Sequence, residues 1–143
     1  MQFQRYFFIL LAVILLTAGT ASANDNTYNY IKAKDLEARL KAKTPTNIVD
    51  IQVEDEFGQH HIPGAIPTHA YPVKSDTDRA KLDVAIAQIN TNTDPVVIVC
   101  PRGAGGAKRT YDYLQEQSVP AERLLILEKG QGGWEYSEFT ESQ

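Results

Sequence analysis

The chain has 143 residues, and its 14 lysines and arginines against 18 aspartates and glutamates give a formal net charge of −4 at pH 7. An acidic balance of this kind does not favour binding to nucleic acid or to an anionic membrane surface. The length suits one domain with one hydrophobic core. Cys100 is the single cysteine, so the chain can form no internal disulfide.

The amino-terminal segment has the composition of a secretory signal. Arg5 precedes an apolar stretch over residues 6–16, and small residues follow as far as Ala23. The apolar core is about ten residues long, against roughly 20 for a membrane-spanning helix, so cleavage is favoured over a stable membrane span. We expect a signal peptide over residues 1–23, one domain over residues 24–143, and export to the periplasm or an equivalent compartment.

The first half of the exported chain alternates between helix and strand. Leu36 and Leu40 are four residues apart, which is the spacing of one helical face. Tyr28 and Tyr30 precede this pattern and are expected on the surface. The predicted elements are a helix over residues 34–42, a strand over 47–50, a helical turn over 53–59 and a proline-rich loop over 61–67.

The second half continues the alternation. Leu82, Ile86 and Ile89 form one apolar stripe, and Ser75 or Asp76 can cap the helix that carries it. The predicted elements are a helix over residues 78–89, a strand over 95–100, a helix that ends before Pro120, a strand over 124–127, and a glycine-rich turn over 129–134 that leads into a short terminal helix. Alternating strands and helices predict an α/β domain with a mostly parallel central sheet and helices on both faces.

Cys100 lies at the end of the apolar run over residues 96–99, and Pro-Arg-Gly-Ala-Gly-Gly follows it directly. Ligands of parallel sheets bind outside the carboxyl ends of the strands. The glycines let backbone amides turn toward the sulfur, and the next helix adds the positive end of its dipole, so a thiolate would be stabilised there. A lone cysteine can also be a small apolar filler, but three glycines within six residues favour a functional thiol.

Four segments, in this order, resemble the rhodanese family of single-domain sulfurtransferases. They are Ile-Val-Asp at residues 48–50; Glu-Phe at 56–57 with His-Ile-Pro-Gly-Ala at 61–65; Val-Ile-Val-Cys at 97–100 with the loop to Gly105; and residues 127–134, which contain three glycines and Trp134. The resemblance implies a rhodanese-like domain and an enzyme of the thiosulfate sulfurtransferase type. In such an enzyme a sulfane sulfur passes from a donor such as thiosulfate to a thiophilic acceptor through a persulfide on Cys100.

The resemblance implies the nucleophile, and the residues around it suggest the rest of the site. Cys100 is the nucleophile, and Asp50 is a supporting residue that ties a turn at a strand end. Lys108 and Arg109 fall in the first helical turn, where cations oppose the dipole, which suggests an electrostatic use near the sulfur. The expected substrate-binding residues are Arg102, Gly103, Ala104, Gly105, Gly106 and Lys108.

No metal or cofactor is expected, because His60, His61 and His69 are irregularly spaced and have no cysteine partner nearby. The sequence departs from the family pattern at three positions. Gln52 stands where many members have arginine, His60 where many have glycine, and Gly105 where arginine or threonine is common. The loop therefore offers fewer side chains to an anionic donor.

Two other functions stay open. A phosphatase or arsenate reductase with a similar cysteine loop needs an arginine six positions after the cysteine, and Gly106 occupies that position, which makes this reading weak. A low-turnover sulfur carrier or binding module that serves a partner protein would suit a loop with few side chains for an anionic donor. The expected partners are a small-molecule sulfur donor and a thiophilic acceptor, or a protein that accepts the sulfur, with no nucleic acid.

Overall fold

A computed structural model describes residues 27–143, so the predicted signal peptide lies outside the described residues. Five strands form one sheet in the order β1-β5-β4-β2-β3, and every pairing in it is parallel. The strands are β1 (Tyr30–Ile31), β2 (Asn47–Asp50), β3 (Ile66–Pro67), β4 (Val96–Val99) and β5 (Leu124–Leu127). The predicted α/β class is confirmed, and β4 occupies the centre of the sheet.

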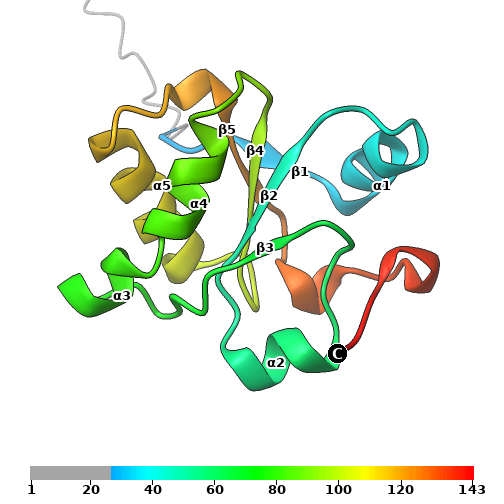
Figure 1. Cartoon of the computed structure of the whole chain (residues 1–143). Helices are drawn as coiled ribbons and strands as arrows, with labels where there is room; N and C mark the ends of the chain where they lie inside the picture. The colour runs from blue at the N-terminus through cyan, green and yellow to red at the C-terminus, as the bar shows by residue number, and fades with distance from the viewer. Residues whose placement is uncertain (1–26) are drawn as a thin grey trace, which may run out of the picture.

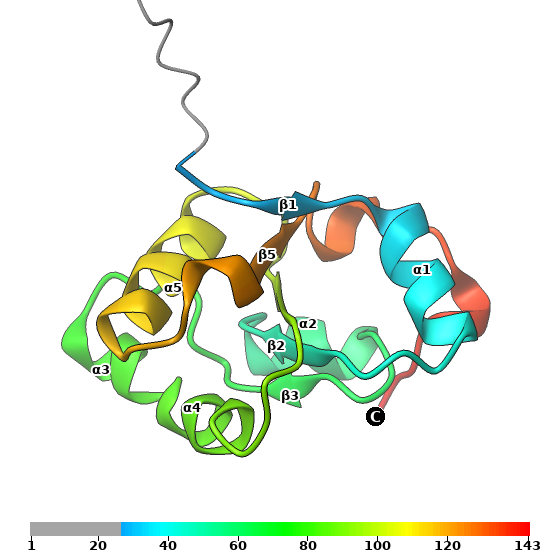
Figure 2. The ribbon, with the colours of Figure 1, turned by 90° about the horizontal axis from the view of Figure 1, so that it is seen from above.

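Helices cover both faces of the sheet, as Figures 1 and 2 show. One face carries α3 (Asp76–Ala80), α4 (Asp83–Ile89) and α5 (Gly105–Glu116), and the other carries α1 (Ala33–Lys41) and the carboxyl-terminal segment. The remaining helices are α2 (Glu54–Gln59), η1 (Ala121–Arg123), η2 (Gln131–Gly133) and η3 (Ser137–Phe139). Within residues 27–143, no helix has the length and apolar character needed to cross a membrane.

The place of β4 in the middle of the sheet explains why its sequence is apolar throughout. Val96 and Ile98 pack in the core under α4 and α5, whereas Val97 and Val99 pack in the core on the α1 side. Successive side chains of a strand point to opposite faces, and both faces of β4 are covered, so all four residues are buried. Cys100 continues this alternation and packs on the side of α4 and α5.

The helix predicted over residues 78–89 is in fact two helices, α3 and α4. Ser75 caps α3 through a capping box, because its Oγ accepts from the Asp78 amide at 3.1 Å and Asp78 Oδ2 accepts from the Ser75 amide at 3.2 Å. Leu82 and Ile89 are fully buried, but α3 buries no residue. The apolar stripe begins only at Leu82, so α4 packs against the core and α3 does not.

Strands β1 and β3 were not predicted from the sequence. Tyr30, expected ahead of the domain, pairs with Ile126 as part of β1, and β3 pairs with β2 at the opposite edge. Each strand has two residues, too few to show an alternating pattern. The two short strands form the edges of the sheet, outside β5 and β2, which are the neighbours of β4.

Candidate active site

Cys100 follows β4 directly, at the carboxyl edge of the sheet, and only 2% of its surface is exposed. The next residues turn back within a short loop, and α5 begins at Gly105. The thiol therefore lies between the end of the central strand and the start of a twelve-residue helix, as the apolar run and the glycines predict.

One loop amide reaches the sulfur. The Gly103 amide donates to Cys100 Sγ at 2.9 Å. Gly103 has a φ of 68°, and a Cβ there would come 2.7 Å from the Lys129 amide nitrogen and 2.8 Å from the Leu127 carbonyl oxygen. Only glycine avoids both the left-handed strain and this overlap, so the identity of residue 103 fixes the position of the amide that contacts the thiol.

Other amides at the start of α5 carry no hydrogen bond. Within the described part of the chain, the amides of Ala104, Gly105, Gly106 and Ala107 have no protein acceptor. The residue at the helix cap is Ala104, which has no side-chain oxygen to occupy them. Free amides and the positive end of the helix dipole favour an anion at this end of α5.

A second loop, from β5 into η2, braces the cysteine loop. The Gln131 amide donates to the Cys100 carbonyl at 2.8 Å, and the Gly132 amide donates to the Pro101 carbonyl at 2.9 Å. Gly130 has a φ of 57°, and a Cβ there would overlap the Cys100 carbonyl oxygen. The backbone of Cys100 is thus held by residues about thirty positions later in the chain.

The segment after β3 packs against the first turn of α5. Arg109 donates from Nε and Nη2 to the Pro72 carbonyl at 3.0 and 2.8 Å, and a Cβ at Gly105 would lie 3.0 Å from Arg109 Nη1. A Cβ at Gly106 would lie 3.0 Å from two carbons of the Tyr71 ring. Arg109 is therefore the cation beside Gly105. Its spacing of four residues from Gly105 is the sequence signal that places both on one helical face.

The two cations predicted as substrate contacts point in different directions. Arg102 is exposed and lines a cavity of about 270 Å³ beside the cysteine loop. Lys108 Nζ lies 5.2 Å from the centroid of the Tyr28 ring, so its contact is with the amino-terminal end of the described chain. The structure brings Arg102 to the site, and a substrate contact by Lys108 stays a prediction.

Asp50 ends β2 and is fully buried. Its Oδ1 accepts from the Gln52 amide at 2.8 Å and its Oδ2 accepts from Gln52 Nε2 at 3.0 Å. Burial raises the pKa of the Asp50 carboxyl to about 6, although the two hydrogen bonds from Gln52 act in the opposite direction. The carboxylate ties the turn that leads from β2 into α2.

His61 is held within the turn that follows α2. Its Nδ1 donates to the Phe57 carbonyl at 2.8 Å, and its ring stacks on the Phe57 ring with centroids 3.9 Å apart. Its Nε2 lies 3.6 Å from Glu141 Oε2. Among residues 27–143, no group of three histidine, cysteine, aspartate or glutamate side chains is close enough to hold a metal ion.

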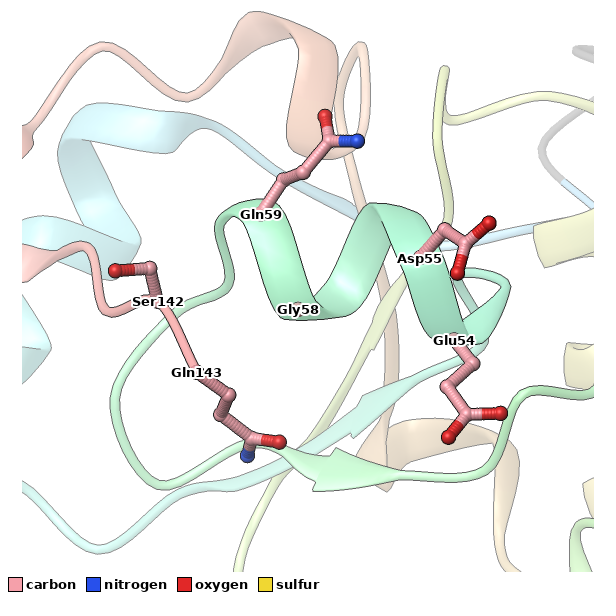
Figure 3. Close-up of a pocket in the computed structure, with 6 residues that line it drawn as sticks. All are labelled: Glu54, Asp55, Gly58, Gln59, Ser142 and Gln143. Atoms are coloured by element: carbon pink, nitrogen blue, oxygen red, sulfur yellow. The ribbon is translucent and has the colours of Figure 1, made fainter.

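Two hollows flank α2. The larger, about 610 Å³, is lined by α2 and the carboxyl-terminal residues and contains no residue of the cysteine loop (Figure 3). The smaller, about 270 Å³, lies between α2 and the cysteine loop. The polar and charged residues that line the smaller cavity are Gln52, Glu56, Gln59, His60, Arg102 and Gln131.

Solved structures share this fold. The chain is 24% identical to a rhodanese-like domain protein from Staphylococcus aureus, with a TM-score of 0.56 over 80% of this chain and 98% of that one. It is 19% identical to a thiosulfate sulfurtransferase from Pseudomonas aeruginosa, with a TM-score of 0.59 over 82% of this chain and 21% of that one. A yeast protein tyrosine phosphatase of the rhodanese family is 16% identical, with a TM-score of 0.63 over 79% of this chain and 91% of that one.

These likenesses show the fold, since each relative is less than a quarter identical in sequence. No curated protein matches the chain. The family model of the rhodanese-like domain matches residues 32–137, which include every strand except β1 and the whole cysteine loop. The chain therefore belongs to the family of rhodanese-like domains.

Proposed function

We propose that this protein is a sulfurtransferase that carries a sulfane sulfur as a persulfide on Cys100. The observation that supports this most directly is the 2.9 Å contact from the Gly103 amide to Cys100 Sγ. It lies beside the amides of Ala104 and of the first three residues of α5, which have no acceptor among the described residues. One amide stabilises the thiolate, and the others are available to a second sulfur attached to it.

The transfer has two balanced steps. The Cys100 thiolate attacks the outer sulfur of a donor such as thiosulfate, a new S–S bond forms, and the donor's S–S bond breaks with its electron pair leaving on sulfite. An acceptor nucleophile then attacks the outer sulfur of the persulfide, and the electron pair returns to Cys100 as thiolate. Neither step needs an added oxidant or reductant.

The site residues argue against phosphoryl chemistry. Gly106 occupies the position where a phosphatase loop of this type needs its arginine. Arg109 is the cation beside the loop, but two of its nitrogens are bound to the Pro72 carbonyl. A tetrahedral dianion held by the loop amides would have no arginine at the position from which such a loop clamps it.

Steady-state formation of thiocyanate from thiosulfate and cyanide tests the proposal. We expect repeated turnover by the parent and none by Cys100→Ser, because a hydroxyl without a general base is a poor nucleophile at neutral pH. A single stoichiometric release followed by no further product would support the carrier function. Thiocyanate formation by Cys100→Ser at the parent's rate would contradict both.

We also propose export through removal of residues 1–23, on the composition of the leader. Amino-terminal sequencing of protein from the native host should find Asn24 first. An intact Met1 in a soluble cytoplasmic pool would contradict this.

A further inference from the structure

Two residues that line the cavity beside the cysteine loop carry buried polar atoms that have no hydrogen-bond partner within the described chain. Only 3% of the surface of Gln131 is exposed, yet neither its Oε1 nor its Nε2 has a hydrogen bond within the described chain. Glu56 Oε2 is buried there without a partner as well. Unsatisfied buried polar atoms are costly, which points to a ligand that satisfies them.

The charges that line the cavity are not neutralised by neighbouring side chains. Gln52 faces the same cavity, but its Nε2 donates to Asp50 Oδ2 at 3.0 Å and to the His60 carbonyl at 3.3 Å. Neither Glu56 nor Arg102 forms an ion pair among residues 27–143. The residues that line the cavity thus include one unpaired carboxylate, one unpaired guanidinium and one side-chain amide without a hydrogen bond.

We propose that this cavity binds the amino-acid end of a small thiol that accepts the sulfur. The ammonium group of such a ligand would bind Glu56, its carboxylate would bind Arg102, and the Gln131 amide can both donate and accept. At roughly 30 Å³ for each water-sized group, about 270 Å³ accommodates about nine non-hydrogen atoms. Cysteine, with about seven, fits this volume.

The inference rests on the proposed function and names its acceptor. The cavity lies beside the cysteine loop, because Pro101 and Arg102 line it and the Gln131 amide bonds to the Cys100 backbone carbonyl at 2.8 Å. The bound thiol, as thiolate, would attack the outer sulfur of the Cys100 persulfide. The S–S bond to Cys100 would break, its electron pair would return to Cys100 Sγ, and the acceptor would leave as a persulfide.

The test compares three thiols on persulfide-loaded protein freed of thiosulfate. Cysteine has both groups, cysteamine lacks the carboxylate and 3-mercaptopropionate lacks the ammonium. We expect Glu56→Gln to slow discharge by cysteine and cysteamine about tenfold and to leave 3-mercaptopropionate unchanged. Arg102→Ala should slow cysteine and 3-mercaptopropionate by a similar factor and leave cysteamine unchanged.

Glu54→Gln is the matched control. It makes the same change of charge on the same helix, but Glu54 lines the other hollow, on the side of the carboxyl terminus (Figure 3). It should leave all three rates unchanged. Discharge by cyanide, which has neither group, should keep the parent's rate in Glu54→Gln and in Glu56→Gln. Equal effects of Glu56→Gln on all three thiols, or no effect on any, would overturn the inference.

A binding measurement separates this inference from the proposed function. S-methylcysteine has the amino-acid end but cannot accept sulfur, so its titration followed by NMR needs no persulfide. Binding by the parent that weakens about tenfold in Glu56→Gln supports the site even if thiosulfate loads no sulfur. Normal loading without such binding would overturn the site and leave the sulfurtransferase function standing. If Glu56→Gln does not fold, Glu56→Ala, which also removes the carboxylate, gives the same comparison.

Discussion

Asp50 shows how a buried carboxyl group at the carboxyl edge of the sheet can make stability depend on pH. Its carboxylate is fully buried and receives two hydrogen bonds from Gln52. Burial favours the protonated carboxyl, and the pKa of Asp50 rises from 3.8 to about 6. The group therefore contributes stability below pH 3.8, and this contribution is lost as the pH rises through about 6.

This linkage predicts the behaviour of Asp50→Asn. The change from 3.8 to about 6 corresponds to about 3 kcal/mol of pH-dependent stability. Relative to the variant, which does not titrate at this position, the parent should lose about that amount between pH 4 and pH 7. Urea unfolding of both proteins across this range measures it. A difference in unfolding free energy that does not change with pH would contradict the account of Asp50.

The position of the thiol at the end of a central strand could be predicted from the sequence, but not all of its surroundings could. Cys100 and Gly103 could be predicted because the strand, the loop and the helix around them are local patterns. The role of Gln131 could not, because it depends on a contact with the Cys100 carbonyl about thirty residues away. The place of Arg109 could be predicted in part. Its helical spacing from Gly105 is visible in the sequence, but its hydrogen bond to the Pro72 carbonyl is not.

At the scale of elements, the cysteine loop keeps its shape because the β5–η2 loop supports it. Gly130→Ala tests this support. Its methyl group would overlap the Cys100 carbonyl oxygen, and its φ of 57° would be strained. We expect a loss of about 3 kcal/mol in unfolding free energy and a marked fall in persulfide loading.

Gly58→Ala is the control for that prediction. A Cβ at Gly58 would have no neighbour within 4 Å, and the residue lies within α2. Alanine is the better helix former, so thermal or urea unfolding should show a gain of about 0.5 kcal/mol and loading should not change. Equal losses in Gly130→Ala and Gly58→Ala would mean that the β5–η2 loop does not support the thiol.

The separation of α3 from α4 also gives a prediction at this scale. Ser75 and Asp78 form a capping box, and α3 buries no residue that could hold it otherwise. Ser75→Ala should lower the unfolding free energy by about 1 kcal/mol. Hydrogen exchange should then quicken in α3 and stay unchanged in α4, which packs through Leu82 and Ile89. Equal acceleration in both would mean that they behave as one helix.

At the scale of the whole molecule, the alternation of apolar strands with helices predicted the α/β fold. The strands over residues 47–50 and 124–127 match β2 and β5 because their apolar runs are buried on both faces of the sheet. The edge strands β1 and β3 were missed because their place depends on pairing with β5 and β2 rather than on their own two residues. The order of the strands also depends on packing between distant segments, so the sequence did not predict it. This order makes β4 the middle strand, and Cys100 follows its carboxyl end.

Mass spectrometry of thiosulfate-treated protein tests the central claim most directly. We expect one added sulfur, about 32 mass units, on the peptide that contains Cys100, and its removal by cyanide. Cys100→Ser should show no addition. Loss of the added mass with formation of one equivalent of thiocyanate would account for the sulfur completely. An unchanged mass in the parent, or the same addition in Cys100→Ser, would contradict a persulfide on Cys100.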